Sequence, residues 1–159
     1  MEVRKEYELM KHKEPDREWL LERLKPNEGF YSLCTKYDTI SFVVLKGLKG
    51  IHTGEAEVAA QHLEIGTNYI ISDDLSFKES LNRRFPHAKI ISTLHIISML
   101  DLHRLIHNRD VLLRTLHLKS PVNIQLLRAS YWESAKEYGI HITKKEVNDK
   151  NNPVKIGIK

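Results

Sequence analysis

Helical and extended patterns alternate between residues 53 and 106, and this alternation constrains the fold more than any other feature of the chain. Thr53 can cap a helix whose three alanines and Leu63 recur at i, i+3, i+4 and i+7, and Gly66 ends it. The following segments predict, in order, a strand, a helix, a second strand and a third helix: Tyr69–Ser72, Leu75–Arg84, Ala88–Ser92 and Leu94–Ile106. This order predicts an α/β domain with a mostly parallel sheet and helices on both faces.

The flanking segments extend this domain in both directions. Before the block, Asp16–Leu24 has the pattern of a short helix, and the β-branched run Thr39–Leu45 predicts a buried strand. After it, one helix is expected from Asn108 to Leu118 and another from Ser120 to Gly139. Beyond Thr143 lysines are frequent and large apolar residues scarce, which favours mobility. We therefore expect one domain over residues 1–142 and a mobile tail over 143–159.

Composition limits the class of protein. The chain of 159 residues can bury one sizeable core, and its net charge of +4 is compatible with a polyanionic partner without establishing one. Its single cysteine, Cys34, excludes an internal disulfide framework and favours a reducing compartment. No apolar run approaches the roughly 20 residues of a membrane helix, and Met1–Lys13 lacks the shape of a signal peptide. The sequence therefore predicts a soluble, cytoplasmic protein without a membrane partner.

Two acidic pairs stand where the predicted fold brings distant segments together. Glu55 and Glu57 lie in the first turn of a helix, and Asp73 and Asp74 follow the next strand. That helix runs antiparallel to the strand, so Glu55 and Asp73 can converge at the sheet edge where open α/β sheets bind ligands. Clustered carboxylates repel unless a cation neutralises them, and oxygen ligands suit Mg²⁺ or Mn²⁺. The structural alternative is that these acids only cap and complement helix N-termini.

The run from Thr53-Gly54-Glu55-Ala56-Glu57 to Ile70-Ile71-Ser72-Asp73-Asp74, followed by Lys89–Leu94 and an apolar helix, resembles the second half of a PIN domain. It is most similar to the prokaryotic branch with a Gly-Glu-Ala-Glu helix start and an Asp-Asp pair. The resemblance covers residues 50–107. It implies a three-layer α/β/α fold and a metal-dependent endoribonuclease. Members of the family are often dimeric and often the toxin of a toxin–antitoxin pair. Their carboxylates hold Mg²⁺ or Mn²⁺, which activates water to attack an RNA phosphodiester.

Carried over residue by residue, the resemblance implies a catalytic and metal-binding role for Glu55 and Asp73, with Asp74 as a further metal ligand. Additional acids are Glu57 and, as counterparts of an earlier helical acid, Glu18 or Glu22. The family's opening strand and its terminal aspartate have no counterpart before Glu2. The chain therefore also resembles a shortened relative, whose metal binding would be weaker and whose hydrolysis would be impaired.

Basic side chains on the helix after the Asp-Asp pair are candidates for contact with an RNA backbone. Lys78, Arg83 and Arg84 lie on this helix, and phosphate contacts by such residues make binding salt-dependent. A solvated helix face explains them equally well. His103 and His107 have the i, i+4 spacing of helical zinc ligands, but surface histidines are the default interpretation.

Two further function classes remain open. The first is a catalytically impaired PIN-like module that binds nucleic acid or a partner protein. The second is a phosphoacceptor receiver-like domain with Asp73-Asp74 as its acidic pocket, against which the lack of a clear phosphoacceptor strand counts.

Overall fold

The computed structural model describes residues 37–158 and shows them as two compact units that divide between Ile90 and Ile91. The sequence predicts a single domain over residues 1–142, so the division after residue 90 differs from that expectation. The expected helix Asp16–Leu24 and the acids Glu18 and Glu22 lie outside the described residues.

The first unit contains the predicted alternation of helices and short strands. Its elements are α3 (Thr39–Lys46), α4 (Thr53–Ile65), β1 (Ile70–Ile71), α5 (Leu75–Arg84) and β2 (Ile90–Ile91). The two strands form a small parallel sheet, joined by a hydrogen bond from the Ile70 N–H to the Lys89 carbonyl of 2.9 Å. Within residues 37–158 the protein is mostly helical, with this one short sheet.

The prediction of a strand at Thr39–Leu45 is wrong, because these residues form α3. The Asp38 carboxylate caps the helix, with Oδ2 accepting the Ser41 N–H at 2.7 Å and Oδ1 accepting the Ile40 N–H at 3.3 Å. These hydrogen bonds, that from Ser41 foremost, hold the pKa of Asp38 below its usual value. Leu45 is completely buried against the core. Capping and packing thus override the low helix propensity of a β-branched run.

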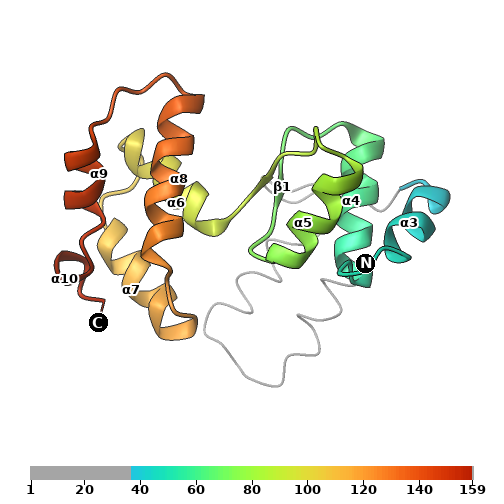
Figure 1. The fold of residues 1–159 in the computed structure, drawn as a ribbon, viewed down its shortest axis with the longest axis horizontal. Helices are drawn as coiled ribbons and strands as arrows, with labels where there is room; N and C mark the ends of the chain where they lie inside the picture. Colours follow the sequence, from blue (N-terminus) through green and yellow to red (C-terminus); the bar gives the residue numbers. More distant parts are fainter. Residues whose placement is uncertain (1–36, 159) are drawn as a thin grey trace, which may run out of the picture. The chain divides into compact units, whose positions relative to one another are not determined.

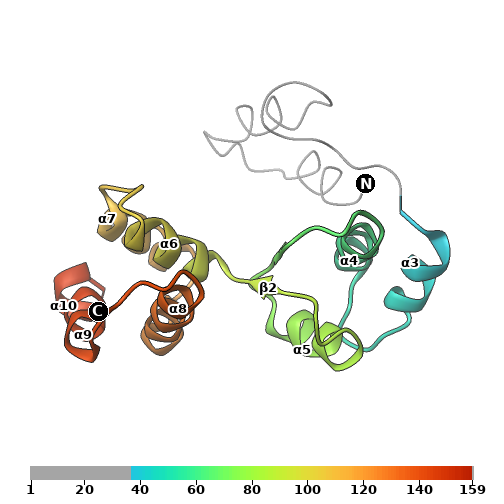
Figure 2. The ribbon, with the colours of Figure 1, turned by 90° about the horizontal axis from the view of Figure 1, so that it is seen from above.

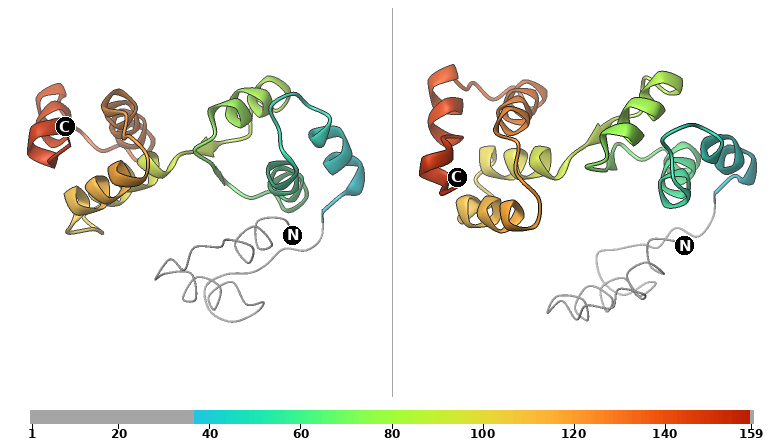
Figure 3. Two further views of the ribbon diagram at one scale, coloured as in Figure 1. Left: turned by 90° about the horizontal axis from the view of Figure 1, so that it is seen from below. Right: turned by 60° about the horizontal axis from the view of Figure 1, so that its bottom comes forward.

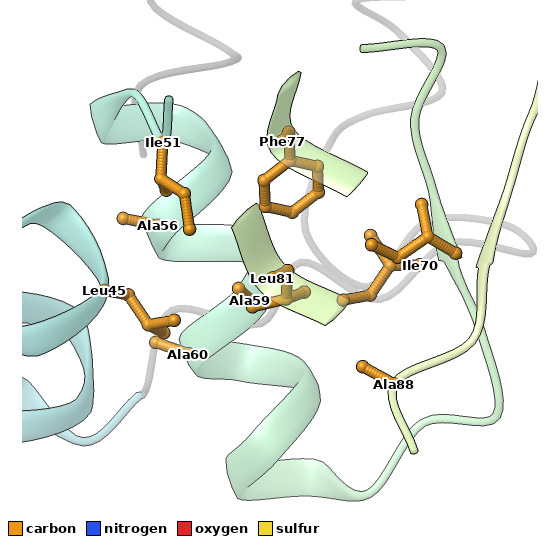
Figure 4. Packing of buried hydrophobic residues seen from close by; sticks show 10 residues of the cluster. Leu45, Ile51, Ala56, Ala59, Ala60, Ile70, Phe77, Leu81 and Ala88 are labelled. Carbon is orange, nitrogen blue, oxygen red and sulfur yellow. The ribbon is translucent and has the colours of Figure 1, made fainter. Parts of the chain in front are cut away.

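The core of the first unit lies where α3, α4 and α5 meet the sheet (Figure 4). The close packing of α4 depends on its alanines, of which Ala56, Ala59 and Ala60 are fully buried as the sequence predicts. Across from them, α5 contributes Phe77 and Leu81, each 1% exposed. Because the buried side chains of α4 are small, α3 packs closely against this helix, and Phe77 and Leu81 of α5 complete the core.

The second unit is entirely helical in its described part. It consists of α6 (Thr93–Leu102), α7 (Arg109–Lys119), α8 (Ile124–Glu137), α9 (Lys144–Lys150) and α10 (Pro153–Ile156). In Figures 1 and 2, α6 and α8 lie side by side, α9 packs against α8, and α10 packs against α7. Leu127, Tyr131 and Ala135 of α8 are buried in this core, as their spacing predicts.

The segment after Thr143 forms two helices instead of the expected mobile tail, and both views in Figure 3 show them packed beside α7 and α8. Thr143 and Glu146 form a capping box at the start of α9. The segment has few apolar residues, but those it has face the core of the second unit: Val147 and Ile156 are at most 1% exposed. Composition alone underestimates how ordered this segment is, because composition does not show which face of a helix the apolar residues occupy.

Candidate functional site

A hollow of about 370 Å³ lies in the first unit where the first turn of α4, the end of β1 and the first turn of α5 meet. We call it the α4–α5 hollow. Its floor is apolar, formed by Val58, Ile70, Ile71 and Phe77, and its polar lining comes from His52, Gly54, Glu55 and Ser72. This combination of an apolar floor and a few polar groups is typical of binding sites for small ligands.

Glu55 lines the α4–α5 hollow and also caps α4. Its Oε2 accepts the backbone N–H of His52 at 2.8 Å, which satisfies a donor at the helix start and leaves Oε1 for another partner. Ser72, at the end of β1, lines the same hollow, and Asp73 is the next residue. The structure thus brings Glu55 to the end of the strand that precedes Asp73. Asp73 itself is exposed and is not part of the lining.

The two remaining acids have separate local roles. Asp74 is the N-cap of α5, where its Oδ1 accepts the Phe77 N–H at 2.9 Å. Glu57 is 8% exposed and accepts a hydrogen bond from the Tyr37 hydroxyl at 3.3 Å, away from the hollow. Within residues 37–158 no group of three or more His, Cys, Asp or Glu side chains has the geometry of a metal site.

The candidate RNA-contacting residues lie at two ends of α5. Lys78 is half-buried near the Asp74 end of the helix, whereas Arg83 and Arg84 are exposed in its last turn. At 1.5 Å per residue, Arg84 lies about 9 Å further along the helix axis than Lys78. None of the three lines the α4–α5 hollow, but Lys78 follows its lining residue Phe77 in the chain.

His103 and His107 are both exposed, as the default interpretation of surface histidines expects, but they do not share a helix face, because α6 ends at Leu102 and Arg104 adopts a left-handed conformation with φ of 58°. His103 instead packs edge-on against the Tyr138 ring, with ring centroids 4.9 Å apart. Two lining residues of the α4–α5 hollow, His52 and Ser72, were not among the predicted site residues. Their sequence signal is their position next to a helix start and to the Asp-Asp pair.

A second hollow of about 650 Å³ lies within the second unit, beside a buried guanidinium. Arg109 is 9% exposed and donates to the Tyr131 hydroxyl at 2.9 Å, to Asp110 and to the Lys150 carbonyl. Tyr131 donates in turn to Asp101 Oδ2 at 2.6 Å, which also accepts from Lys150 Nζ at 2.8 Å. We call these five residues the Arg109 network. It joins α6, α7, α8 and α9 through charged hydrogen bonds.

The network shifts the protonation equilibria of its members. Burial raises the pKa of Asp101, but hydrogen bonds from Lys150 and Tyr131 and the charges of Lys150 and Arg109 outweigh it and hold this pKa below its usual value. Burial and the hydrogen bond to Asp101 raise the pKa of Tyr131, which therefore stays neutral at physiological pH. The Arg109 network is thus a set of matched partners with a structural role.

Comparison with known proteins assigns no family: no family model matches the chain, and neither a curated protein nor a solved structure resembles it significantly. Between residues 37 and 158, every helix is too short or too polar to cross a lipid bilayer.

Proposed function

We propose that the first unit is a PIN-like, three-layer α/β/α endoribonuclease domain, in which acids at the α4–α5 hollow hold Mg²⁺ or Mn²⁺ for cleavage of an RNA phosphodiester. One observation carries the proposal: Glu55 from α4 and Ser72 from the end of β1 line the same hollow. The acid at the helix start and the strand end before Asp73 are thereby neighbours, although they are far apart in sequence.

The donor chemistry of these residues fits a hard divalent cation. Glu55 uses one carboxylate oxygen for the cap and Asp74 uses Oδ1 for the Phe77 N–H, so each side chain has a second oxygen to offer. Asp73, the residue before Asp74, is exposed. When bound, such a cation supplies an activated water and stabilises charge on the phosphate. We expect Lys78 to pair with a neighbouring phosphate.

A cleavage assay tests these roles. Purified protein is incubated with labelled single-stranded RNA and Mn²⁺, and the rates of Glu55→Gln and Asp73→Asn are compared with wild type. Glutamine still fits the capping position, so Glu55→Gln removes charge while preserving α4. We expect each substitution to slow cleavage by about 100-fold or more, because each removes an anionic ligand.

Glu64→Gln is the matched control, because it makes the same change at an exposed position of α4 distant from its first turn. It should cleave at the wild-type rate. Equal cleavage by wild type and Asp73→Asn would refute the assigned roles, and cleavage unaffected by a chelator would refute the metal dependence.

The alternative function is a PIN-like module without hydrolytic activity that binds nucleic acid or a partner protein. The observation that favours it is the engagement of both Glu55 and Asp74 with backbone N–H groups, which accounts for these acids structurally. Calorimetric titration with Mn²⁺ separates the two functions. The nuclease predicts a heat of binding that Asp73→Asn abolishes, and the module predicts none.

The same proposal extends to partners and location. As a cytoplasmic toxin of a toxin–antitoxin pair, the protein would arrest growth when expressed alone, and Asp73→Asn would relieve the arrest. A homodimer would appear in light scattering at twice the chain's mass of 18.6 kDa. Growth unaffected by the wild-type chain would refute the toxin assignment.

A further inference from the structure

Positive charge is concentrated in the second unit, although the proposed catalytic residues lie in the first. Residues 91–158 contain ten Lys and Arg against six Asp and Glu, whereas residues 37–90 contain six against seven. The first described unit is therefore slightly acidic, and the second carries the excess that would attract a polyanion.

The outward face of α8 combines this charge with an exposed aromatic ring. Arg128, Trp132 and Lys136 follow one another at i, i+4 and i+8, so they lie along one side of the helix, with Arg128 half-buried at the edge of the packed face and Trp132 and Lys136 exposed. Trp132 is 43% exposed. The two cations are separated by about 12 Å along the helix axis, one on each side of the ring.

None of these three side chains has a partner among the described residues. Nε of Arg128 is buried without a hydrogen-bond acceptor, and neither Trp132 nor Lys136 takes part in a hydrogen bond, ion pair or ring contact within residues 37–158. Because Nε is enclosed by the protein, the guanidinium can meet a phosphate only through its two terminal nitrogens.

Both acids of α8 lie near His95 of α6, although Glu133 follows Trp132 in the chain and its side chain is 67% exposed. Glu133 and Glu137 lie 3.7 and 3.6 Å from the two ring nitrogens of the buried His95. Their carboxylates are thus directed to the α6 side. The Arg128–Trp132–Lys136 face, which we call the α8 stripe, remains basic.

We infer that the α8 stripe is a binding site for single-stranded RNA, with a base stacked on Trp132 and flanking phosphates held by Arg128 and Lys136. The inference rests on the proposed function, because it supplies the substrate contact for that nuclease. Charge complementarity identifies the occupant, and the exposed ring favours a nucleic acid strand over an acidic peptide, since every base offers a planar face. Phosphate oxygens accept charge-assisted hydrogen bonds from guanidinium and ammonium groups such as those of Arg128 and Lys136.

Fluorescence quenching tests the site directly. Trp132 is the sole tryptophan in a Trp19→Phe background, and Asp73→Asn in the same chain prevents cleavage. A uridine oligomer is added in the presence of a chelator. We expect it to quench Trp132, and Trp132→Ala to weaken binding about 5- to 100-fold in an anisotropy assay, with Trp132→Phe in between.

Charge neutralisation provides the matched control. Arg128→Gln with Lys136→Gln should lower the slope of log K against log salt by about 1.4, the value for two phosphate contacts to a single strand. Lys144→Gln with Lys145→Gln removes the same charge from the exposed start of α9 and should affect binding much less.

Four outcomes would overturn the inference: no binding by the parent chain, unchanged binding by Trp132→Ala, equal losses in the two charge pairs, or equal quenching by polyglutamate. These outcomes are distinguishable from failure of the proposed function. Mn²⁺-dependent cleavage that requires Asp73 but is unaffected by Trp132→Ala would refute only the binding role of the α8 stripe. Quenching of Trp132 without any cleavage would refute only the proposed nuclease activity.

Discussion

Replacing Tyr131 by phenylalanine tests whether the Arg109 network stabilises the second unit. The ring is fully buried, and its hydroxyl accepts from Arg109 at 2.9 Å and donates to Asp101 at 2.6 Å. Hydrogen bonds to charged groups contribute about 1.5–3 kcal/mol each. In the variant, Asp101 still accepts a hydrogen bond from Lys150, and Arg109 still donates to Asp110. We therefore expect the free energy of unfolding to fall by about 2–3 kcal/mol, close to the contribution of one such hydrogen bond.

Urea denaturation measures this loss. The fluorescence of Trp132 in a Trp19→Phe background reports on the second unit, and with a slope of about 1–3 kcal/mol per molar urea the midpoint should fall by about 1 M. Tyr138→Phe is the control, because its hydroxyl is on an exposed residue and contacts only Met99 Sδ, at 3.0 Å, among the described partners. It should change stability by less than about 0.5 kcal/mol. An equally small change in Tyr131→Phe would refute a stabilising role for the network.

Three further predictions concern stability. The pKa of Asp101 is lowered in the folded protein. The contribution of Asp101 to the free energy of unfolding is therefore fully present above its unfolded pKa of about 3.9, and it is lost as pH falls through the lower folded value. Asp101→Asn should make stability depend less on pH in acid unfolding followed by circular dichroism. Gly157→Ala should destabilise more than Gly66→Ala in thermal melts. Both glycines have positive φ, but only at Gly157 would a Cβ meet Arg114 Nε at 2.9 Å, and equal melting temperatures would contradict this. Leu81→Ala should cost about 2–5 kcal/mol through the cavity it leaves, and a loss below about 1 kcal/mol in urea would show that the core collapses around it.

Sequence reasoning located those elements whose signals are local. The interval Leu75–Arg84 was predicted with both bounds, because Asp74 can cap it and Pro86 follows it. It also predicted that Glu55 and Asp73 converge; the α4–α5 hollow is lined by Glu55 and Ser72 but not by Asp73, so the convergence stays a prediction. The roles of these acids in metal binding and catalysis stay predictions.

The misses have physical causes. At Thr39–Leu45, β-branched composition favours a strand, but the Asp38 cap and the burial of Leu45 produce a helix. The Arg109 network was not predictable, because Arg109 and Lys150 lie 41 positions apart and only the folded chain brings them together. The α8 stripe, in contrast, has a sequence signal in its i, i+4 spacing.

The long-range bond between α6 and α9 has a consequence for synthesis. Lys150 is synthesised 49 residues after its partner Asp101. The helices and strands of the described first unit, in contrast, are all complete once Ile91 has been added. On the ribosome, this part of the first unit can fold while the second still exposes an unpaired carboxylate and an open apolar cleft between incomplete helices. Slow translation between these positions would lengthen the interval in which chaperones or proteases can reach the nascent chain.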